Sequence, residues 1–130
     1  LAAVLLLMAG CAGMTYAPVK YSSGVMTGPN GMTLYTFDKD VPGSGKSVCN
    51  GQCATNWPPF AAPANEGAGG DWSIVTRDDG SKQWACAGKP LYYYAKDQQP
   101  GDVTGDNFNK IWRVVQKPAT DYSTGNFSGP

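Results

Sequence analysis

The stretch Leu34-Tyr-Thr-Phe-Asp-Lys-Asp40 is written again, with small changes, as Leu91-Tyr-Tyr-Tyr-Ala-Lys-Asp97. Aligned from the preceding glycines, Gly31 and Gly88, the two copies share Gly, Leu, Tyr, Lys and Asp. A chain of 130 residues has the length for one modest core, not for two separate ones. We therefore predict a single small domain of two tandem pseudo-repeats around one core, repeat one at about 21–60 and repeat two at about 72–116.

The sequence around these two copies is rich in aromatic residues, Val, Thr and Gly, and turn residues recur every eight to twelve positions. This pattern indicates a mainly β fold with at most short helical turns. We predict strands at 21–27, 32–37, 72–76, 82–87, 91–95 and 111–116, with residues 77–81 as the hairpin loop between the third and fourth. Short helical turns are predicted at 51–56 and 106–111, a surface loop at 58–70, and a flexible tail at 117–130.

Strand alternation places Tyr35 and Phe37 on one face and Leu34 on the other, and repeat two follows the same pattern. Asp40 and Asp97 stand before Pro-Gly loops, where an Asp commonly accepts backbone N–H bonds and holds the turn. We favour this structural interpretation, with the tyrosines as core residues that carry a polar group. Two alternatives stay open: the Tyr/Asp pairs and the four Trp residues line a ligand groove, or the loop carboxylates of Asp97, Asp102 and Asp106 bind calcium.

The chain opens with an apolar, uncharged run, residues 1–10, that is too short to span a bilayer and resembles the end of a signal peptide. Ala9-Gly10-Cys11 resembles a bacterial lipobox, in which the cysteine is lipidated. We therefore expect Cys11 to be the lipidation site and residues 11–20 to be a tether. Ala12 in place of an Asp favours the periplasmic side of the outer membrane. A plain secretory signal with an unrelated cysteine is the alternative.

A known family combines these features. The pattern Y-x-[FWY]-x-x-D is followed by C-x-x-x-C and by a Trp-Pro-Pro segment at 57–59, and the chain thereby resembles the secreted-repeat lipoproteins of bacteria, a family of unknown function. The resemblance covers about residues 19–116. It implies location and architecture but no chemistry. Its motif falls on Tyr35, Phe37, Asp40, Tyr92, Tyr94 and Asp97.

Three cysteines remain besides Cys11. In an oxidising exterior we expect Cys49 and Cys53 to form a disulfide, which is worth only about 2 kcal/mol for so small a loop. Cys86 is then left over, most simply as a buried free thiol. Two alternatives stay open: Cys86 is an alternative disulfide partner, or it joins Cys49, Cys53 and a methionine such as Met26 or Met32 in a copper or zinc site. The three thiols would then make the chain a periplasmic soft-metal or redox protein.

Composition excludes several functions. Ten basic and ten acidic residues balance, no basic cluster exists, and nucleic acid is therefore not an expected partner. Histidine is absent, which removes the commonest general base and metal ligand. We predict no catalytic residues, resident metal or cofactor. The expected function is a non-enzymatic binding module of the cell envelope, lipid-anchored and contacting an envelope protein, a glycan or a small ligand.

Overall fold

The computed structural model describes residue 11 and residues 17–64 and 68–117. The predicted signal remnant at 1–10, much of the tether and nearly all of the predicted tail lie outside these residues. The described chain is mainly β, in three small antiparallel sheets with one short α-helix and one 3₁₀ turn. Within these ranges, no helix is long and apolar enough to cross a bilayer.

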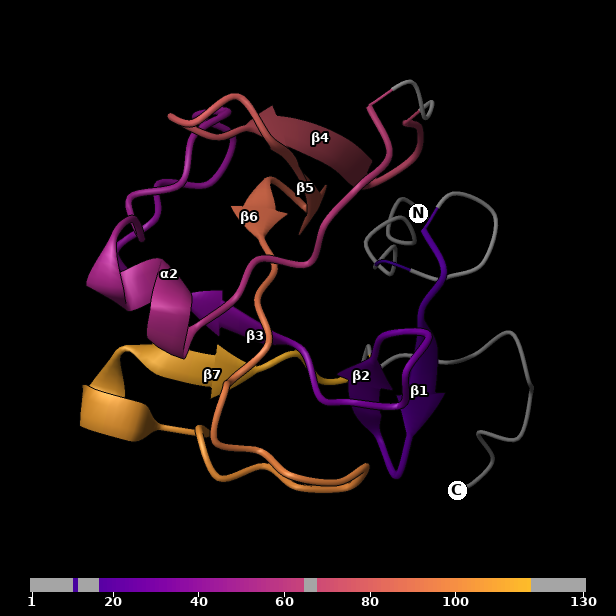
Figure 1. Ribbon diagram of the computed structural model, residues 1–130. Helices are drawn as coiled ribbons and strands as arrows, with labels where there is room; N and C mark the ends of the chain where they lie inside the picture. The colour runs from indigo at the N-terminus through magenta and orange to yellow at the C-terminus, as the bar shows by residue number, and fades with distance from the viewer. Residues whose placement is uncertain (1–10, 12–16, 65–67, 118–130) are drawn as a thin grey trace, which may run out of the picture.

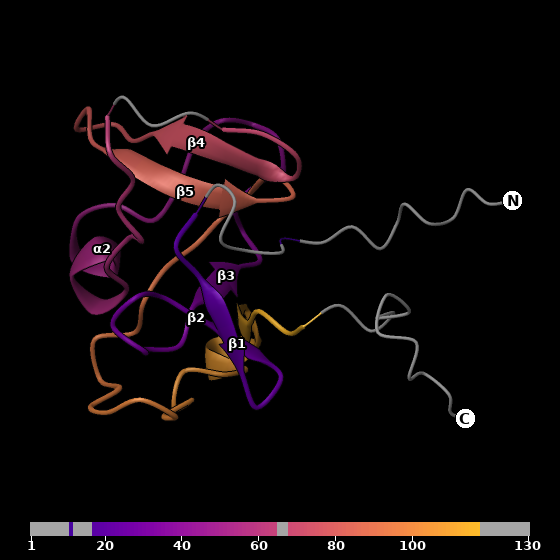
Figure 2. The same ribbon diagram turned by 90° about the vertical axis from the view of Figure 1, so that its right-hand side faces the viewer.

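Four strand pairings build the three sheets, whose strands are labelled in Figure 1. The turned view in Figure 2 separates the upper β4–β5 hairpin from the β1–β2 hairpin below it. The pairs are β1 (Lys20–Ser22) with β2 (Val25–Thr27), β3 (Tyr35–Phe37) with β7 (Trp112–Val114), and β5 (Lys82–Cys86) with both β4 (Trp72–Thr76) and β6 (Lys89–Pro90). The helical elements are α2 (Gln52–Asn56) and η1 (Phe108–Lys110).

The predicted strand at 21–27 is wrong in one respect: it is a hairpin. Ser23 and Gly24 have φ values of 52° and 81°, and two successive residues with positive φ make the tight turn that matches the twist of paired strands. Repeat one thus begins with a hairpin, as repeat two does with β4 and β5. The β4–β5 hairpin was predicted nearly to the residue.

The predicted strand at 91–95 is also wrong, and its partner explains why. Tyr92 forms isolated bridges with Tyr35 and Pro59, and Tyr93 donates its N–H to the Pro58 carbonyl (2.7 Å). Pro58 and Pro59 have no N–H, so they cannot complete a ladder. The corresponding partner of β3 is Arg113-Val114, which can donate, and there a regular ladder forms.

The end of repeat two completes repeat one. Leu34 donates its backbone N–H to the Met26 carbonyl (3.0 Å), Met26 donates to Val115 (2.8 Å), and Val115 donates back to Leu34 (3.2 Å). Val115 follows β7, so the last strand of the chain closes the sheet of the first repeat. Repeat one therefore has no complete sheet without residues 112–116.

The end of repeat one completes repeat two in the same way. Leu91 donates its N–H to Trp84 (3.0 Å), Trp84 donates to Phe60 (2.9 Å), and Phe60 donates to Leu91 (2.9 Å). This second ring of bonds matches the first residue by residue. The two predicted pseudo-repeats are confirmed, and each lends its final segment to the other.

The repeated glycines occupy equivalent turns. Gly31 and Gly88 have φ values of +82° and +81°, a backbone region that residues with a Cβ rarely adopt. At Gly88 a Cβ would also lie 2.6 Å from the backbone nitrogen of Gly43, which donates to the Gly88 carbonyl. The glycine of the repeat is therefore required by both backbone angle and close chain approach.

Two buried clusters fill the molecule, one on each face of the repeated Leu-Tyr segments. As the alternation predicts, Leu34 and Leu91 point into one cluster, and Tyr35 and Tyr92 into the other. The first, here called the leucine cluster, comprises Cys11, Ala17, Val19, Met26, Leu34, Phe60, Trp72, Trp84 and Leu91. The second, the tyrosine cluster, comprises Tyr35, Cys49, Trp57, Tyr92, Tyr94 and Trp112.

Candidate functional site

The two repeated tyrosines meet at the centre of the pseudo-symmetry. Tyr35 donates its N–H to the Tyr92 carbonyl (2.7 Å), and Tyr92 donates its N–H to the Tyr35 carbonyl (2.9 Å). Both side chains are fully buried, with 0% exposure. A ligand groove lined by these tyrosines, one of the sequence alternatives, is therefore excluded.

The tyrosine hydroxyls cross to the opposite repeat. The Tyr35 hydroxyl donates to Asp97 Oδ2 (2.7 Å), and the Tyr92 hydroxyl donates to Asp40 Oδ2 (2.5 Å). In the sequence each motif Tyr stands five residues before the Asp of its own copy. The structure instead joins each Asp to the tyrosine of the other copy, so these bonds link the repeats.

The second oxygen of each carboxylate holds the loop that follows it. Asp40 Oδ1 accepts the Val48 N–H (2.8 Å). Asp97 Oδ1 accepts both the N–H (3.0 Å) and the hydroxyl (2.6 Å) of Thr104. The prediction that these aspartates fix turns is confirmed, and the two loops are held by equivalent bonds.

Burial and hydrogen bonding determine which of these groups is charged. The pKa values of Tyr35 and Tyr92 are raised well above 10.0, mainly by burial and further by the hydrogen bond to a carboxylate. Burial also raises the pKa of Asp40, while hydrogen bonds from Tyr92 and Val48 and the charge of Arg77 oppose that rise. Both tyrosines thus remain protonated donors over the physiological range.

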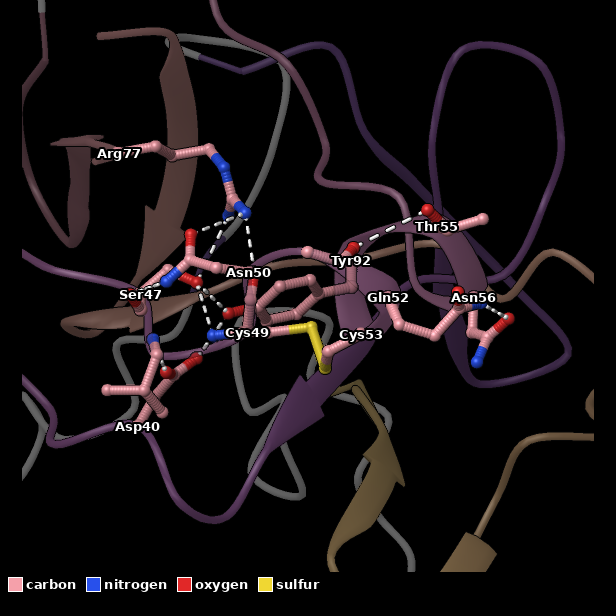
Figure 3. The surroundings of a disulfide bond; sticks show 12 residues. Asp40, Ser47, Cys49, Asn50, Gln52, Cys53, Thr55, Asn56, Arg77 and Tyr92 are labelled. Carbon is pink, nitrogen blue, oxygen red and sulfur yellow. Dashed lines mark hydrogen bonds between the residues drawn. A yellow bond between two sulfur atoms is a disulfide. The ribbon is translucent and has the colours of Figure 1, made fainter. Parts of the chain in front are cut away.

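A buried arginine that could not be recognised from the sequence supports the Asp40 corner. Arg77 is only 4% exposed although it begins the charged hairpin loop at 77–81. Its guanidinium donates to Gln83 Oε1 (2.7 Å), to Ser47 Oγ (3.0 Å) and to the Cys49 carbonyl (2.6 Å). Ser47 Oγ in turn lies 2.7 Å from the Tyr92 hydroxyl, as Figure 3 illustrates.

The predicted Cys49–Cys53 disulfide is present and closes the loop that leads into α2 (Figure 3). Trp57 then caps the helix by donating its N–H to the Cys53 carbonyl (2.8 Å). The bridge therefore fixes the chain at the point where Trp57 enters the tyrosine cluster.

Cys86 is not the free thiol that the sequence suggested. It forms a disulfide with Cys11, with a Cα–Cα distance of 5.7 Å, and this pairing was missed because Cys11 was assigned to lipidation. All four cysteines of the chain are therefore paired in this structure. The soft-metal site built from Cys49, Cys53 and Cys86 is ruled out for this state, because no thiolate is left to bind a metal.

Four aromatic rings form a continuous stack across the pseudo-symmetry axis. Phe37 stacks on Trp112 (4.1 Å between centroids), Trp112 on Trp57 (3.8 Å), and Trp57 on Tyr94 (4.0 Å). Successive rings of the stack come alternately from repeat one and repeat two. The stack is symmetric, with the two Trp rings in the middle and one other aromatic ring at each end. The motif positions Phe37 and Tyr94 are thus equivalent supports of the central Trp pair.

The tryptophans are core residues and do not form exposed platforms. Each is at most 3% exposed. The indole nitrogen of Trp84 is buried in the leucine cluster without a hydrogen-bond partner. At one end of the stack the buried Tyr94 lies beside Phe108 (5.8 Å between ring centroids), which is 40% exposed.

An open pocket of about 600 Å³ lies at this end of the stack. Its walls combine aromatic, hydroxyl, amide and ammonium groups. The lining residues are Tyr94, Ala95, Lys96, Gln98, Thr104 and Phe108. Tyr94 of the second motif copy and the loop 97–106 meet at this pocket. The shape of the pocket therefore depends on Asp97, which holds that loop.

The loop carboxylates do not converge on a common point. Asp102 Oδ2 accepts the N–H groups of Gln98 and Gln99, and Asp106 Oδ1 accepts that of Val114. Within the described part of the chain, no three His, Cys, Asp or Glu side chains are grouped as a metal site requires. Asp97, Asp102 and Asp106 therefore do not form the calcium loop considered from the sequence.

Comparison with known proteins supports the repeat architecture. Two segments of the chain, residues 19–61 and 73–116, each match the family described as a secreted repeat of unknown function. No curated protein and no solved structure matches the chain. The family description and the two disulfides indicate an exported protein. The chain belongs to this family of secreted repeats of unknown function.

Proposed function

We propose that this protein is a non-enzymatic module of the cell envelope that binds an acidic cell-wall glycan in the pocket at Tyr94. The observation that carries the proposal is the composition of that pocket. Phe108, 40% exposed and supported by the buried Tyr94, offers an aromatic surface for a sugar ring, Gln98 and Thr104 offer hydrogen bonds to hydroxyls, and Lys96 offers a positive charge. Such a combination suits a sugar that carries a carboxylate.

Rigidity favours this pocket as a binding surface. Tyr94 is stacked on Trp57, and Asp97 holds the Thr104 loop through two hydrogen bonds. A wall that is already ordered loses little entropy when a ligand binds. The disposition of the acidic and hydroxyl groups also supports a binding role over catalysis: Asp40, Ser47 and Tyr92 are buried and bonded to one another.

A titration with soluble, carboxylate-bearing peptidoglycan fragments tests the proposal. Trp57 reports on the pocket through its stacking on Tyr94, so binding is expected to change tryptophan fluorescence. Replacing Phe108 by Ser or Lys96 by Ala is expected to weaken binding about tenfold each, corresponding to about 1.4 kcal/mol. Isothermal titration calorimetry measures the affinities.

Lys39 provides the matched control. It stands at the position of Lys96 in the other repeat and is exposed, so Lys39→Ala makes the same change of charge away from the pocket. Its affinity is expected to equal that of the wild type. Absence of any heat or fluorescence change with the glycan, or equal weakening by Lys39→Ala and Lys96→Ala, would contradict the assignment of the pocket.

We further propose that the module is anchored at the periplasmic side of the outer membrane through a lipid on Cys11. The support is the sequence Ala9-Gly10-Cys11 and the membership of a secreted family. Membrane fractionation of the full chain tests it, with incorporation of a labelled fatty acid as the second readout. Cys11→Ser is expected to remove the label and release the protein; a wild-type chain without label would refute the anchor.

A further inference from the structure

The sulfur of Cys11 has two competing chemical partners. In the structure it is bonded to the sulfur of Cys86, whereas lipidation would place a carbon on the same atom. A sulfur that already carries its own Cβ forms only one further bond in either product. Lipid anchor and disulfide therefore exclude each other within one molecule.

The disulfide places Cys11 in a position that has no room for a lipid chain. Cys11 is 1% exposed and belongs to the leucine cluster, among close-packed side chains. Its carbonyl accepts the Tyr21 hydroxyl (3.1 Å), which fixes the backbone there as well. A diacylglyceryl group is many times larger than this position, so a lipidated Cys11 must lie outside it.

Cys86 is accessible enough to react when it is not bonded to Cys11. It ends strand β5 and stays partly exposed even with Cys11 bonded to it, and the next residue, Ala87, is exposed. The chain has four cysteines, and Cys49 and Cys53 are bonded to each other. With Cys11 on a lipid, Cys86 is the one cysteine left as a thiol.

We propose that Cys86 is a thiol–disulfide exchange site of the lipid-anchored protein and the covalent clasp of its unanchored form. The proposal rests on the lipid anchor proposed above. In the anchored form the Cys11 thiol has received a diacylglyceryl group from a phospholipid, whose phosphate headgroup leaves with the thiol proton. The Cys86 thiolate then attacks a disulfide of an envelope thiol, forms a mixed disulfide and releases the other sulfur as a thiolate.

In the unanchored form, the two thiols close on each other. Cys11 and Cys86 together lose two protons and pass two electrons to a protein disulfide oxidant of the exterior, whose disulfide becomes a dithiol. This reaction blocks the lipidation sulfur and buries Cys11 in the leucine cluster. The state of Cys86 consequently reports whether a given molecule is anchored.

Mass spectrometry of the full-length protein, separated into membrane and soluble pools, tests the proposal. Cells are treated with a maleimide before lysis to label free thiols, and a parallel sample is treated with an aromatic disulfide. Lipidated molecules are expected to carry one maleimide, on Cys86, and to release one aromatic thiolate per chain. Molecules without lipid are expected to carry none until they are reduced.

Two variants separate Cys86 from the other cysteines. In Cys86→Ser the lipidated pool is expected to lose its label completely, and the unlipidated pool to gain a label on Cys11. In the double variant Cys49→Ser, Cys53→Ser, Cys86 of the lipidated pool is expected to remain labelled. The peptide masses identify each labelled site directly.

The outcomes distinguish the two proposals. Lipidated molecules whose Cys86 neither reacts with the maleimide after denaturation nor carries a disulfide-linked thiol that reduction releases would overturn the exchange site and leave the anchor intact. Unlipidated molecules with both Cys11 and Cys86 free would overturn the clasp. If no lipidated molecule is found, the anchor itself fails, and the exchange site fails with it.

Discussion

At the scale of single residues, each motif aspartate joins two parts of the molecule. One oxygen of Asp40 holds the loop at Val48, and the other accepts the hydroxyl of Tyr92 from the opposite repeat. Asp40 and Asp97 differ in the further side chains that support them. Arg77 and Ser47 support the Asp40 corner, whereas Thr104 alone supplies the extra hydroxyl at Asp97.

The crossed pair of Tyr92 and Asp40 is expected to be energetically coupled. Tyr92→Phe leaves a buried carboxylate oxygen without its donor, and Asp40→Asn weakens the acceptor. A double-mutant cycle in urea is expected to give a coupling free energy of about 1–3 kcal/mol. Tyr93→Phe serves as the control in a cycle with Asp40→Asn, because the hydroxyl of Tyr93 is not hydrogen-bonded to a carboxylate. A coupling near zero for Tyr92 would contradict the bond.

Alkaline pH is expected to destabilise the protein through the same tyrosines. Their pKa values are raised in the folded state, so above pH 10 the unfolded chain loses phenolic protons that the folded chain keeps. Each such tyrosine lowers the free energy of unfolding by about 1.4 kcal/mol per pH unit in that range. Tyr92→Phe should reduce the slope by one tyrosine. Urea titrations between pH 9 and about pH 11 measure it, and an unchanged slope in the variant would refute the argument.

At the scale of elements, the sequence predicted those features that depend on local patterns. The β4–β5 hairpin followed from two strand-like segments around the turn residues of 77–81, and the faces of the Leu-Tyr segments followed from strand geometry. Strand pairing between segments far apart in the sequence was not predicted. Nothing local indicates that Pro58-Pro59 lies beside Tyr92, and a strand was predicted where the missing N–H groups prevent one.

The candidate site was predictable in its residues but not in its connections. The motif named Tyr35, Asp40, Tyr92 and Asp97, but it does not show that each Asp bonds to the Tyr of the other copy. Arg77 resembled an ordinary charge in a surface turn, because burial of an arginine depends on partners far away in sequence. The structure was needed to identify the pocket, since its residues become neighbours only after the loop at 97–106 folds back.

The central tryptophans are expected to contribute equally to stability, because each occupies the same position in the symmetric stack. Trp57→Ala and Trp112→Ala should each cost about 3–5 kcal/mol, the usual range for removing a large buried ring. Phe108→Ala, at the exposed end, should cost well under half of that. Urea denaturation measures all three. A difference of more than about 2 kcal/mol between the two Trp variants would argue against equivalent roles.

At the scale of the whole molecule, the exchange of terminal segments makes the two repeats one folding unit. Residues 112–116 complete the sheet of repeat one, and residues 57–61 complete that of repeat two. The hydrogen bonds from the Tyr35 and Tyr92 hydroxyls also join one repeat to the other. Unfolding is therefore expected to be a single cooperative transition for both halves.

Cutting the chain between the repeats tests this unity. A fragment that ends at residue 64 is expected to be unfolded alone, because it lacks the partner of β3 and the donor to Met26. Mixed with a fragment that starts at residue 68, it is expected to recover native circular dichroism and amide protection in the pair. A fragment of 1–64 with dispersed amide resonances by itself would show that the exchange is not required.

The position of β7 near the end of the chain also bears on the timing of export. Strand β3 finds its partner only at Trp112–Val114, so a growing chain that has not yet reached these residues holds an incomplete sheet. Contacts so distant in sequence form slowly and late. The nascent polypeptide thus stays incompletely folded until residues 112–114 have been made, and an incompletely folded chain is what a translocation channel for unfolded chains requires of its cargo.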